Sequence, residues 1–320
     1  MTFLKYLSNQ LNSITKIYKK SSIWGKIFLF SLLVVLIVVI FKGNKNTNTN
    51  NKEGFIQSEQ FVVKTGQDIY DDFYADIYDY LVYNKVKNNY EIGQIVNAAG
   101  PSSESIILDI GCGTGDHVNA LSMKGMDVIG LDLSQAMISK AKQKYPKSKF
   151  QVGDVLNGDL YKYNSFTHIL CMYFTIYYFK NKLQFFNNCF NWLMPGGYLI
   201  IHLVNRDEFD PILPPGNPLL LVSPQKYAKQ RITTTKVKFT DFSYHADFQL
   251  DKSNNQAKFM EKFKQDKEGK VRKNEHILYM ESQESILTQS QEAGFILQGK
   301  VDLTKAQYEY QYLYILTKPN

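Results

Sequence analysis

The run ILDIGCGTGDH, residues 107–117, places three glycines at alternate positions directly after an apolar segment. Gly111, Gly113 and Gly115 would let the chain turn sharply against a ligand, because glycine adopts backbone angles that other residues avoid. A helix that begins at such a turn directs its first amide groups toward whatever lies above it. The pattern therefore predicts a site for polar or anionic groups, and it fits several nucleotide-like cofactors.

Strand-like and helix-like runs alternate around this turn. The strand candidates are 106–108, 126–134, 149–157, 165–179 and 198–204, and the helix candidates between them are 118–125, 135–146 and 182–197. Such alternation predicts right-handed βαβ units and a parallel sheet that binds ligands at the carboxyl ends of its strands. Asp109, Asp132 and Asp154 all fall at such ends.

A dinucleotide-binding fold also begins with a strand and a glycine turn. Its G-x-G-x-x-G fingerprint needs a third glycine at position 116, where this chain has Asp116. The observed order is G-x-G-x-G, followed by Asp132 seventeen residues after Gly115, by Gly153-Asp154, and by LMPGGYLII at 193–201. The glycine turn alone is weak evidence, but the ordered set argues against a dinucleotide fingerprint.

On these motifs, residues 61–320 resemble the class I S-adenosylmethionine-dependent methyltransferases. The resemblance implies a Rossmann-like α/β domain with three layers, α/β/α, and a seven-stranded, mostly parallel sheet whose last strand is antiparallel. The C-terminal part agrees, because residues 291–318 suggest a helix that stops near Gly294 and two strands able to form a hairpin. One departure is Thr167, where the family usually has an aspartate at a position remote from the methyl group.

The resemblance also assigns residues to the cofactor S-adenosylmethionine. Asp109 and the backbone of Gly111 and Gly113 would hold the methionine end, and Tyr173 would lie beside it. Asp132 would accept hydrogen bonds from both ribose hydroxyls, for which a carboxylate is well suited. Taken alone, Asp132 could equally cap the following helix.

The same resemblance places the adenine base and a lid. Leu133 and Met137 would cover the adenine, while Asp154 and the Val155 amide would contact its edge; Asp154 alone could also be an ordinary turn residue. Residues 69–81, IYDDFYADIYDYL, resemble the amino-terminal lid helix of small-molecule methyltransferases. Two tyrosines of this lid, Tyr70 and Tyr78, and two cysteines, Cys112 and Cys171, complete the expected cofactor site.

The reaction implied is an in-line methyl transfer, in which the protein aligns a nucleophile and excludes water. The catalytic candidates are His202, Tyr173 and Tyr177, although a buried structural histidine is the competing interpretation of His202. The family often has His or Glu near Tyr177, and this chain has neither there. An N-P-P-Y type motif is also absent after the fourth strand, which disfavours nucleic-acid amino groups as acceptors.

Cysteine and histidine spacing fits no metal site, because neither paired cysteines nor an HExxH pattern occurs. Residues 1–52 hold eight of the 37 Lys and Arg and none of the 30 Asp and Glu, so the rest of the chain is close to neutral. We therefore expect no metal and no broad nucleic-acid-binding face.

The amino-terminal part has three predicted segments. We expect residues 1–22 to form a basic amphipathic segment, for which a plain soluble helix is the competing interpretation, and residues 42–60 an Asn-rich linker. Residues 23–41 are expected to form a transmembrane helix, with a cleaved signal peptide and a buried core helix as the alternatives. Flanking lysines weakly place the amino terminus in the cytosol. The absence of N-x-Ser/Thr acceptors and the cytosolic source of the cofactor favour the opposite orientation. We expect a single-pass membrane protein with a cytosolic catalytic domain.

An insertion at about 205–275 separates the fifth strand from the final hairpin. Its prolines suggest an ordered loop, alternating runs such as KVKFTDFSYHADFQL suggest strands, and residues 261–275 suggest a charged hairpin tip. We expect this insertion to cover and select the methyl acceptor. The sequence thus favours a membrane-tethered methyltransferase for a small-molecule or lipid-associated acceptor. A catalytically inactive cofactor-binding scaffold and a protein methyltransferase remain as alternatives.

Overall fold

The computed structural model describes residues 22–27, 30–31, 59–216 and 224–320. The chain divides into two compact units, Met1–Lys52 and Glu53–Asn320. In the first unit, the described residues 23–27 are helical. No helix among the described residues is both long and apolar enough to cross a bilayer. Residues 1–21, 28–29 and 32–58, which make up almost all of the predicted segments 1–22 and 42–60 and most of 23–41, fall outside the described residues.

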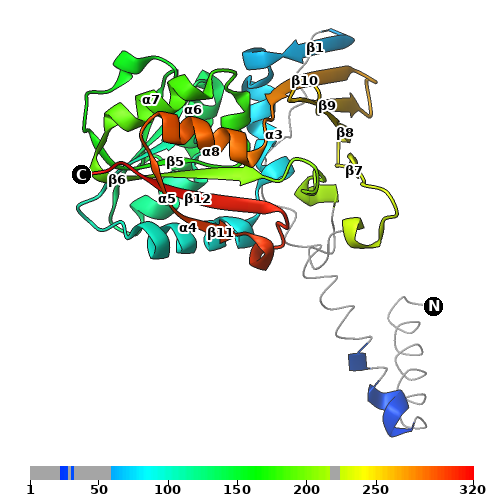
Figure 1. Cartoon of the computed structure of the whole chain (residues 1–320). Helices are drawn as coiled ribbons and strands as arrows, with labels where there is room; N and C mark the ends of the chain where they lie inside the picture. The colour runs from blue at the N-terminus through cyan, green and yellow to red at the C-terminus, as the bar shows by residue number, and fades with distance from the viewer. Residues whose placement is uncertain (1–21, 28–29, 32–58, 217–223) are drawn as a thin grey trace, which may run out of the picture. The chain divides into compact units, whose positions relative to one another are not determined.

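The second unit is built on a seven-stranded sheet (Figure 1). The strands lie in the order β11 (Ile296–Asp302), β12 (Gln311–Thr317), β6 (Leu193–Val204), β5 (Phe166–Cys171), β2 (Ile106–Ile110), β3 (Asp127–Asp132) and β4 (Lys149–Val152). Strand β12 is antiparallel to both of its neighbours, and the pairs from β6 to β4 are parallel. The expected mostly parallel sheet with an antiparallel last strand is confirmed.

The strands are apolar at successive positions, and successive side chains point to opposite faces, so both faces of this sheet are buried, as expected for parallel strands. Ile107 and Leu170 belong to a core shared with helices α4 (Lys85–Ala99), α5 (Asp116–Ser122) and α6 (Gln135–Lys144). Leu108 and Ile169, one residue away on the same strands, belong to a core shared with α7 (Lys182–Trp192) and α8 (Gln283–Glu292). The result is the expected three-layer α/β/α arrangement (Figure 1).

The insertion forms a second sheet of its own, a feature that its alternating runs alone did not predict. Its strands lie in the order β1 (Phe61–Thr65), β10 (Val271–Tyr279), β9 (Gln256–Gln265), β8 (Phe242–Asp251) and β7 (Thr234–Lys238). The charged run 261–275, expected as a hairpin tip, is mostly strand: only residues 266–270 form the turn between β9 and β10, and Glu261, Arg272 and Asn274 are buried. Strand β1, from before the core domain, pairs in parallel with β10. The proline-rich part contains the short 3-10 helix η4 (Pro214–Gly216).

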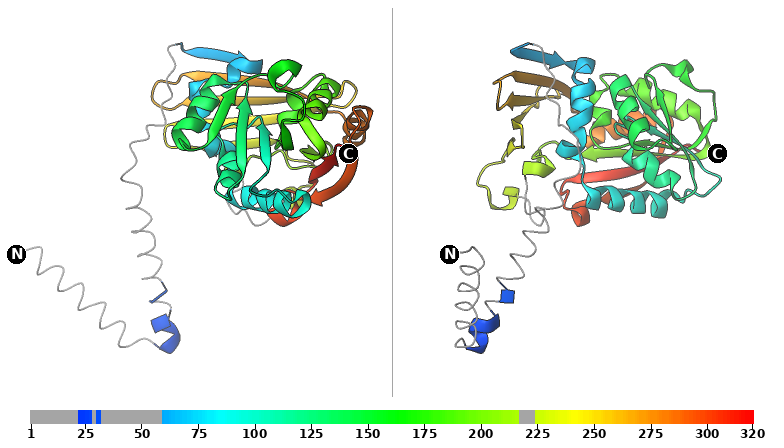
Figure 2. Two further views of the ribbon diagram at one scale, coloured as in Figure 1. Left: turned by 90° about the vertical axis from the view of Figure 1, so that its left-hand side faces the viewer. Right: turned by 180° about the vertical axis from the view of Figure 1, so that it is seen from behind.

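Helix α3 (Asp72–Val82) packs beside both the inserted sheet and the core (Figure 2). Asp71 starts this helix, because its side chain accepts a hydrogen bond from the Tyr74 amide. Ile77 and Leu81 are buried on the inner face of the helix. The predicted lid helix at 69–81 therefore corresponds to α3 and the 3-10 turn η1 (Gly66–Ile69) before it.

Candidate active site

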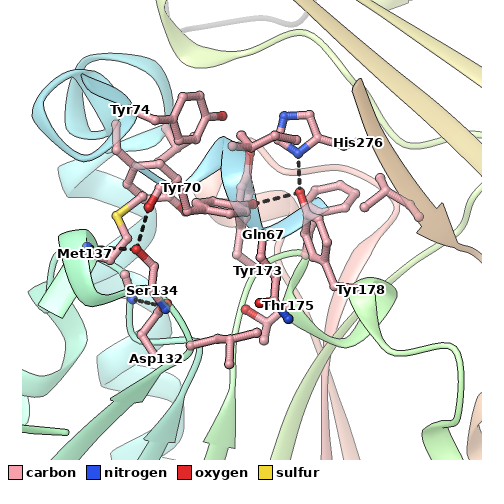
Figure 3. Close-up of a pocket in the computed structure, with 18 of the residues that line it drawn as sticks. Gln67, Tyr70, Tyr74, Asp132, Ser134, Met137, Tyr173, Thr175, Tyr178 and His276 are labelled. Carbon is pink, nitrogen blue, oxygen red and sulfur yellow. Dashed lines mark hydrogen bonds between the residues drawn. The ribbon is translucent and has the colours of Figure 1, made fainter. Parts of the chain in front are cut away.

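A cavity of about 1060 Å³ lies where the carboxyl ends of the core strands meet α3 and the inserted sheet. The core contributes the ends of β2, β3 and β4 and the 3-10 helix η3 (Thr175–Tyr178), which follows β5. The inserted sheet contributes β8, β9 and β10. One cavity therefore runs from the glycine turn to the inserted sheet (Figure 3).

The glycine turn is held by the neighbouring strand. The amides of Gly111 and Cys112 both donate to the carbonyl of Leu131 at 2.7 and 3.0 Å. Gly111 has a positive φ of 66°, and a Cβ atom there would collide with the side chain of Thr175 on η3. The turn therefore requires glycine at 111 both for its backbone angle and for space, which lets the chain approach the cavity closely.

Asp132 ends β3 at the floor of the cavity. One carboxylate oxygen accepts the Gly113 amide and the other accepts the Ser134 amide, both at 2.9 Å. A carboxylate offers about four lone-pair positions, so the carboxylate can still accept from a ligand hydroxyl. Burial raises the pKa of Asp132, while the backbone hydrogen bonds oppose that rise. The geometry fits a vicinal diol held by two oxygens.

Asp109 lies behind the glycine turn rather than on the cavity wall. It is 2% exposed, and burial raises its pKa to about 7. A cationic group bound near the turn would therefore favour its ionised form. Asp109 therefore supports the glycine turn and places a titratable carboxyl group behind it, and it does not contact the cavity directly.

A buried ionic cluster lies beside the methionine end that the sequence predicts. Lys87 and Glu91 of α4 pair at 2.9 Å, and His117 Nε2 lies 3.0 Å from Glu91. The Lys87 ammonium lies 4.9 Å from the centre of the Tyr173 ring. Tyr173 itself has φ of 53°, which is uncommon for a bulky residue and marks a constrained position on the cavity wall.

The lid helix is fixed over the glycine turn by polar contacts. The Thr114 hydroxyl donates to Asp79 of α3 at 2.5 Å, and Lys144 of α6 pairs with the same carboxylate. The Tyr78 ring lies 3.4 Å from where a Cβ atom on Gly113 would be. Tyr78 of α3 and Tyr70, just before this helix, both line the cavity, so the lid segment forms part of its wall.

Three side chains at the far end of the cavity form a hydrogen-bonded chain (Figure 3). The Tyr70 hydroxyl donates to the Tyr178 hydroxyl at 2.8 Å, and that oxygen lies 2.8 Å from His276 Nδ1. His276 Nε2 lies 2.8 Å from the buried carboxylate of Glu261. Sequence reasoning missed His276 and Glu261. In β10, alternate residues are buried and three of the four are polar, so the sequence VRKNEHILY has no apolar alternation that would have indicated His276.

The structure brings most of the predicted cofactor residues to the cavity wall. Those that line it are Tyr70, Tyr78, Gly111, Gly113, Asp132, Leu133, Met137, Asp154, Val155 and Tyr173. The predicted cofactor residues Asp109, Cys112 and Cys171 do not line it, and neither do the catalytic candidates Tyr177 and His202. Most of the first group lies together because it lies at or just after the ends of β2, β3, β4 and β5, whereas Tyr70 and Tyr78 come from the lid segment and Met137 from α6.

Two of the three catalytic candidates, His202 and Tyr177, do not line the cavity. His202 is fully buried within β6, where burial and the nearby Lys87 lower its pKa to about 4. The Tyr177 hydroxyl accepts the Val204 amide at 2.8 Å and is fully buried. Both side chains therefore serve the core, and Tyr173 is the candidate that lines the cavity. The described residues contain no cluster of three or more metal-ligating side chains.

Parts of this chain are similar to known methyltransferases. Residues 107–197 match a family model described as a methyltransferase domain. A dTDP-4-amino-2,3,4,6-tetradeoxy-D-glucose N,N-dimethyltransferase of Saccharopolyspora spinosa is 31% identical over 42% of this chain and 55% of its own length. A dTDP-3-amino-3,4,6-trideoxy-alpha-D-glucopyranose N,N-dimethyltransferase of Streptomyces venezuelae is 26% identical over 42% of this chain and 58% of its own. The chain thus spans little more than half of these relatives.

Solved structures share the fold at low sequence identity. An S-adenosylmethionine-dependent methyltransferase from Clostridium acetobutylicum has a TM-score of 0.57 and 19% identity, covering 77% of this chain and 98% of that protein. The CcbJ methyltransferase from Streptomyces caelestis has a TM-score of 0.60 and 15% identity, covering 80% and 100%. At these identities the likeness is one of architecture.

Proposed function

We propose that this chain, which carries a class I S-adenosylmethionine-dependent methyltransferase domain, methylates the amine of a small molecule. The observation that carries the proposal is the single cavity that joins the Asp132 end to the space under the inserted sheet. The relatives named as amino-sugar N,N-dimethyltransferases support a nitrogen acceptor.

The residues at the core end of the cavity fit the cofactor. Asp132 would hold the ribose hydroxyls, Leu133 and Met137 would cover the adenine, and Gly111 and Tyr173 would border the methionine part. When bound, S-adenosylmethionine supplies a methyl group already activated on a sulfonium. The chain then has to align the acceptor and exclude water, and α3 with the inserted sheet encloses the space where this would happen.

The charge of the cavity favours a cationic or neutral acceptor over a phosphorylated one. Among the described residues that line it, Lys64 is the only Lys or Arg. Four carboxylates outside the expected cofactor site line the same cavity, besides Asp71, whose charge is paired with Arg272: Asp68, Asp72, Asp210 and Glu275. An excess of negative charge raises the local concentration of cations and opposes a diphosphate. Phe209, Phe248 and Phe259 supply apolar surface for the body of the acceptor.

The test uses labelled S-adenosylmethionine and two matched acceptors. We expect methyl transfer to free 4-amino-2,3,4,6-tetradeoxy-D-glucose and weaker transfer to its dTDP conjugate, because the conjugate adds two phosphates. The N-acetylated free sugar is the control, since it lacks a basic nitrogen. Equal transfer to the acetylated sugar would contradict a nitrogen acceptor. Transfer only to protein bands would favour a protein methyltransferase.

Membrane tethering is a separate part of the proposal and rests on the apolar run at 23–41 and on the lysines around it. We propose a single span with the methyltransferase domain in the cytosol. The full chain should float with phosphatidylcholine vesicles in a density gradient, whereas residues 53–320 should stay at the bottom. If both float or neither does, the amino-terminal segment is not the anchor. Protease protection in sealed microsomes tests the orientation.

A further inference from the structure

The hydrogen-bonded chain from Tyr70 to Glu261 has a defined direction. Glu261 is 1% exposed. Its carboxylate accepts hydrogen bonds from the Tyr244 hydroxyl at 2.7 Å and the Asn274 side-chain amide at 3.0 Å, and it lies 2.8 Å from His276 Nε2. Burial acts to raise the pKa of Glu261, but the hydrogen bond from His276, the charge that His276 carries when protonated, and the hydrogen bonds from Tyr244 and Asn274 together lower it. Because an ionised carboxylate only accepts hydrogen bonds, His276 must donate through Nε2.

The rest of the order follows from His276. In its neutral form, His276 donates at Nε2 and accepts at Nδ1, and the Tyr178 hydroxyl then donates to Nδ1. Tyr178 in turn accepts from Tyr70, whose oxygen therefore has lone pairs for another donor. Tyr70, Tyr178 and His276 all line the cavity. The protons of the chain point in sequence from the cavity toward the buried carboxylate.

We propose that Tyr70, Tyr178 and His276, with Glu261 behind them, form a proton relay that deprotonates the acceptor amine. This inference rests on the proposed function. The acceptor enters as R-NH₃⁺, which has no lone pair for attack. One of its protons passes to the Tyr70 oxygen as the Tyr70 proton moves to Tyr178 and the Tyr178 proton to His276 Nδ1. The products are R-NH₂ and an imidazolium paired with the Glu261 carboxylate.

Charge and atoms balance through the complete reaction. The free amine attacks the methyl carbon, the carbon–sulfur bond breaks, and the bonding pair stays on sulfur. The product is R-NH₂CH₃⁺ with S-adenosylhomocysteine, and His276 later returns its proton to water. Burial raises the pKa of both tyrosines, so they pass protons without holding a negative charge at neutral pH. The arrangement has the logic of a carboxylate that orients and supports a histidine base.

Stability alone does not explain why His276 and Glu261 are buried here. A buried His and Glu pair takes two polar groups from water, and apolar residues of similar size often pack there at no loss of stability. The His276 ring is 2% exposed and lies among Tyr70, Tyr74, Tyr178 and Phe259, with ring centres within 6.1 Å. These contacts fix the ring so that Nδ1 faces the cavity side and Nε2 faces the carboxylate.

The first test reads the tautomer and needs no acceptor. The full chain in detergent, labelled with ¹⁵N-histidine, is examined by long-range ¹H–¹⁵N correlation with S-adenosylhomocysteine present, and His276→Gln assigns the signal. We expect Nε2 to carry the proton and Nδ1 to be unprotonated at pH 7. A proton on Nδ1 alone, or an imidazolium at pH 7, would overturn the relay.

The second test measures kcat/KM with the free amino sugar at pH 7 and pH 9.5. His276→Gln and Tyr178→Phe should each lose about 10²-fold or more at pH 7. The deficit should shrink at least about tenfold at pH 9.5, where more of a primary amine is unprotonated in solution. The titratable groups that face His276 are Tyr70, Tyr74, Tyr178 and Glu261, with Tyr244 and Arg272 behind Glu261 and Asn274.

The matched control is His245→Gln, in the same sheet on β8 and outside the cavity wall. It should keep kcat/KM within about twofold at both pH values, as for substitutions away from the site. Equal deficits for His276→Gln at both pH values would mean a structural role and overturn the proposal. A wild-type chain that methylates no amine overturns the proposed function instead, and the tautomer experiment still decides the order of the hydrogen bonds.

Discussion

The Asp132 carboxylate accepts hydrogen bonds from the backbone amides of Gly113 and Ser134, and it also lines the cavity. Asp132→Asn keeps the shape but loses the charge, and its amide can accept through one atom only. Because hydrogen bonds to charged groups contribute about 1.5–3 kcal/mol, affinity for S-adenosylmethionine should fall roughly 10- to 100-fold. Calorimetric titration measures this. Asp127→Asn, at the exposed start of the same strand, should leave the affinity unchanged, and equal losses in both variants would contradict the role of Asp132.

Asp109 links the apo protein's stability to pH. Its ordinary pKa of 3.8 rises to about 7 in the fold, so the folded state binds a proton that the unfolded state releases. Stability from this group is therefore complete below about pH 4 and is lost as pH rises through about 7. Between pH 5 and pH 8 the loss should be about 2–3 kcal/mol.

Urea unfolding at the two pH values checks this. Asp109→Asn stays neutral, so its free energy of unfolding should fall less over the same range than that of the wild type. Asp127→Asn should keep the wild-type difference. If the Asp109→Asn and wild-type curves run parallel, Asp109 does not titrate in this range.

The cofactor end of the site could be predicted because its residues are fixed locally. Asp132 ends a strand, and Gly111 and Gly113 follow one, so the parallel sheet brings them together whatever the rest of the chain does. The His276 and Glu261 pair could not be predicted in this way. Their contact depends on the register of β10 against β9 and on how that sheet packs on η3, neither of which a single run of residues specifies.

Among the elements, strand β10 holds the start of the lid helix. Arg272, 4% exposed, donates to both oxygens of Asp71 at 2.9 and 2.8 Å and to the Ile69 carbonyl at 2.8 Å. Its guanidinium also lies 4.8 Å from the centre of the Phe73 ring. Asp71 caps α3, so a single arginine joins the inserted sheet to the cap of the helix that covers the cofactor end.

Arg272→Met should therefore loosen the lid. Removing one partner of a buried pair costs about 3–5 kcal/mol, and because Asp71 is 35% exposed we expect about 2–3 kcal/mol here. Amide hydrogen exchange across residues 66–82 should accelerate. Lys273→Met, the adjacent exposed position on the same strand, should change stability by less than about 0.5 kcal/mol. Unaltered exchange in Arg272→Met would show that α3 is held by its apolar face alone.

The core elements were predictable because each strand and helix carries its own periodicity, and the inserted sheet was predictable only as strand-like runs. Strand β1 illustrates the reason. Its five residues, FVVKT, pair with Val271–Glu275, about two hundred positions later, and nothing in the short run itself identifies that partner.

For residues 53–320 as a whole, the inserted sheet and the core share their apolar interior. Phe248, Ala257 and Leu278 of the inserted sheet belong to the same buried cluster as Leu203 and Val204 of β6. A second cluster joins α3 and Met137 of α6 to Phe242 and Phe263. Two layers that share a continuous core should unfold together, because neither can lose its partner without exposing apolar surface.

Residues 53–320 should accordingly show one thermal transition. Trp192, 1% exposed, is the single tryptophan of this part of the chain and reports on the core, while hydrogen exchange of β9 and β10 reports on the inserted sheet. Both midpoints should coincide, and S-adenosylmethionine at 100 times its Kd should stabilise both by about 2.7 kcal/mol. Phe248→Ala removes a ring from the shared interior and should lower both midpoints equally. If β9 and β10 exchanged at a lower temperature than Trp192 fluorescence changed, the inserted sheet would be a separately folding cover, and closure over the acceptor would then be a docking step.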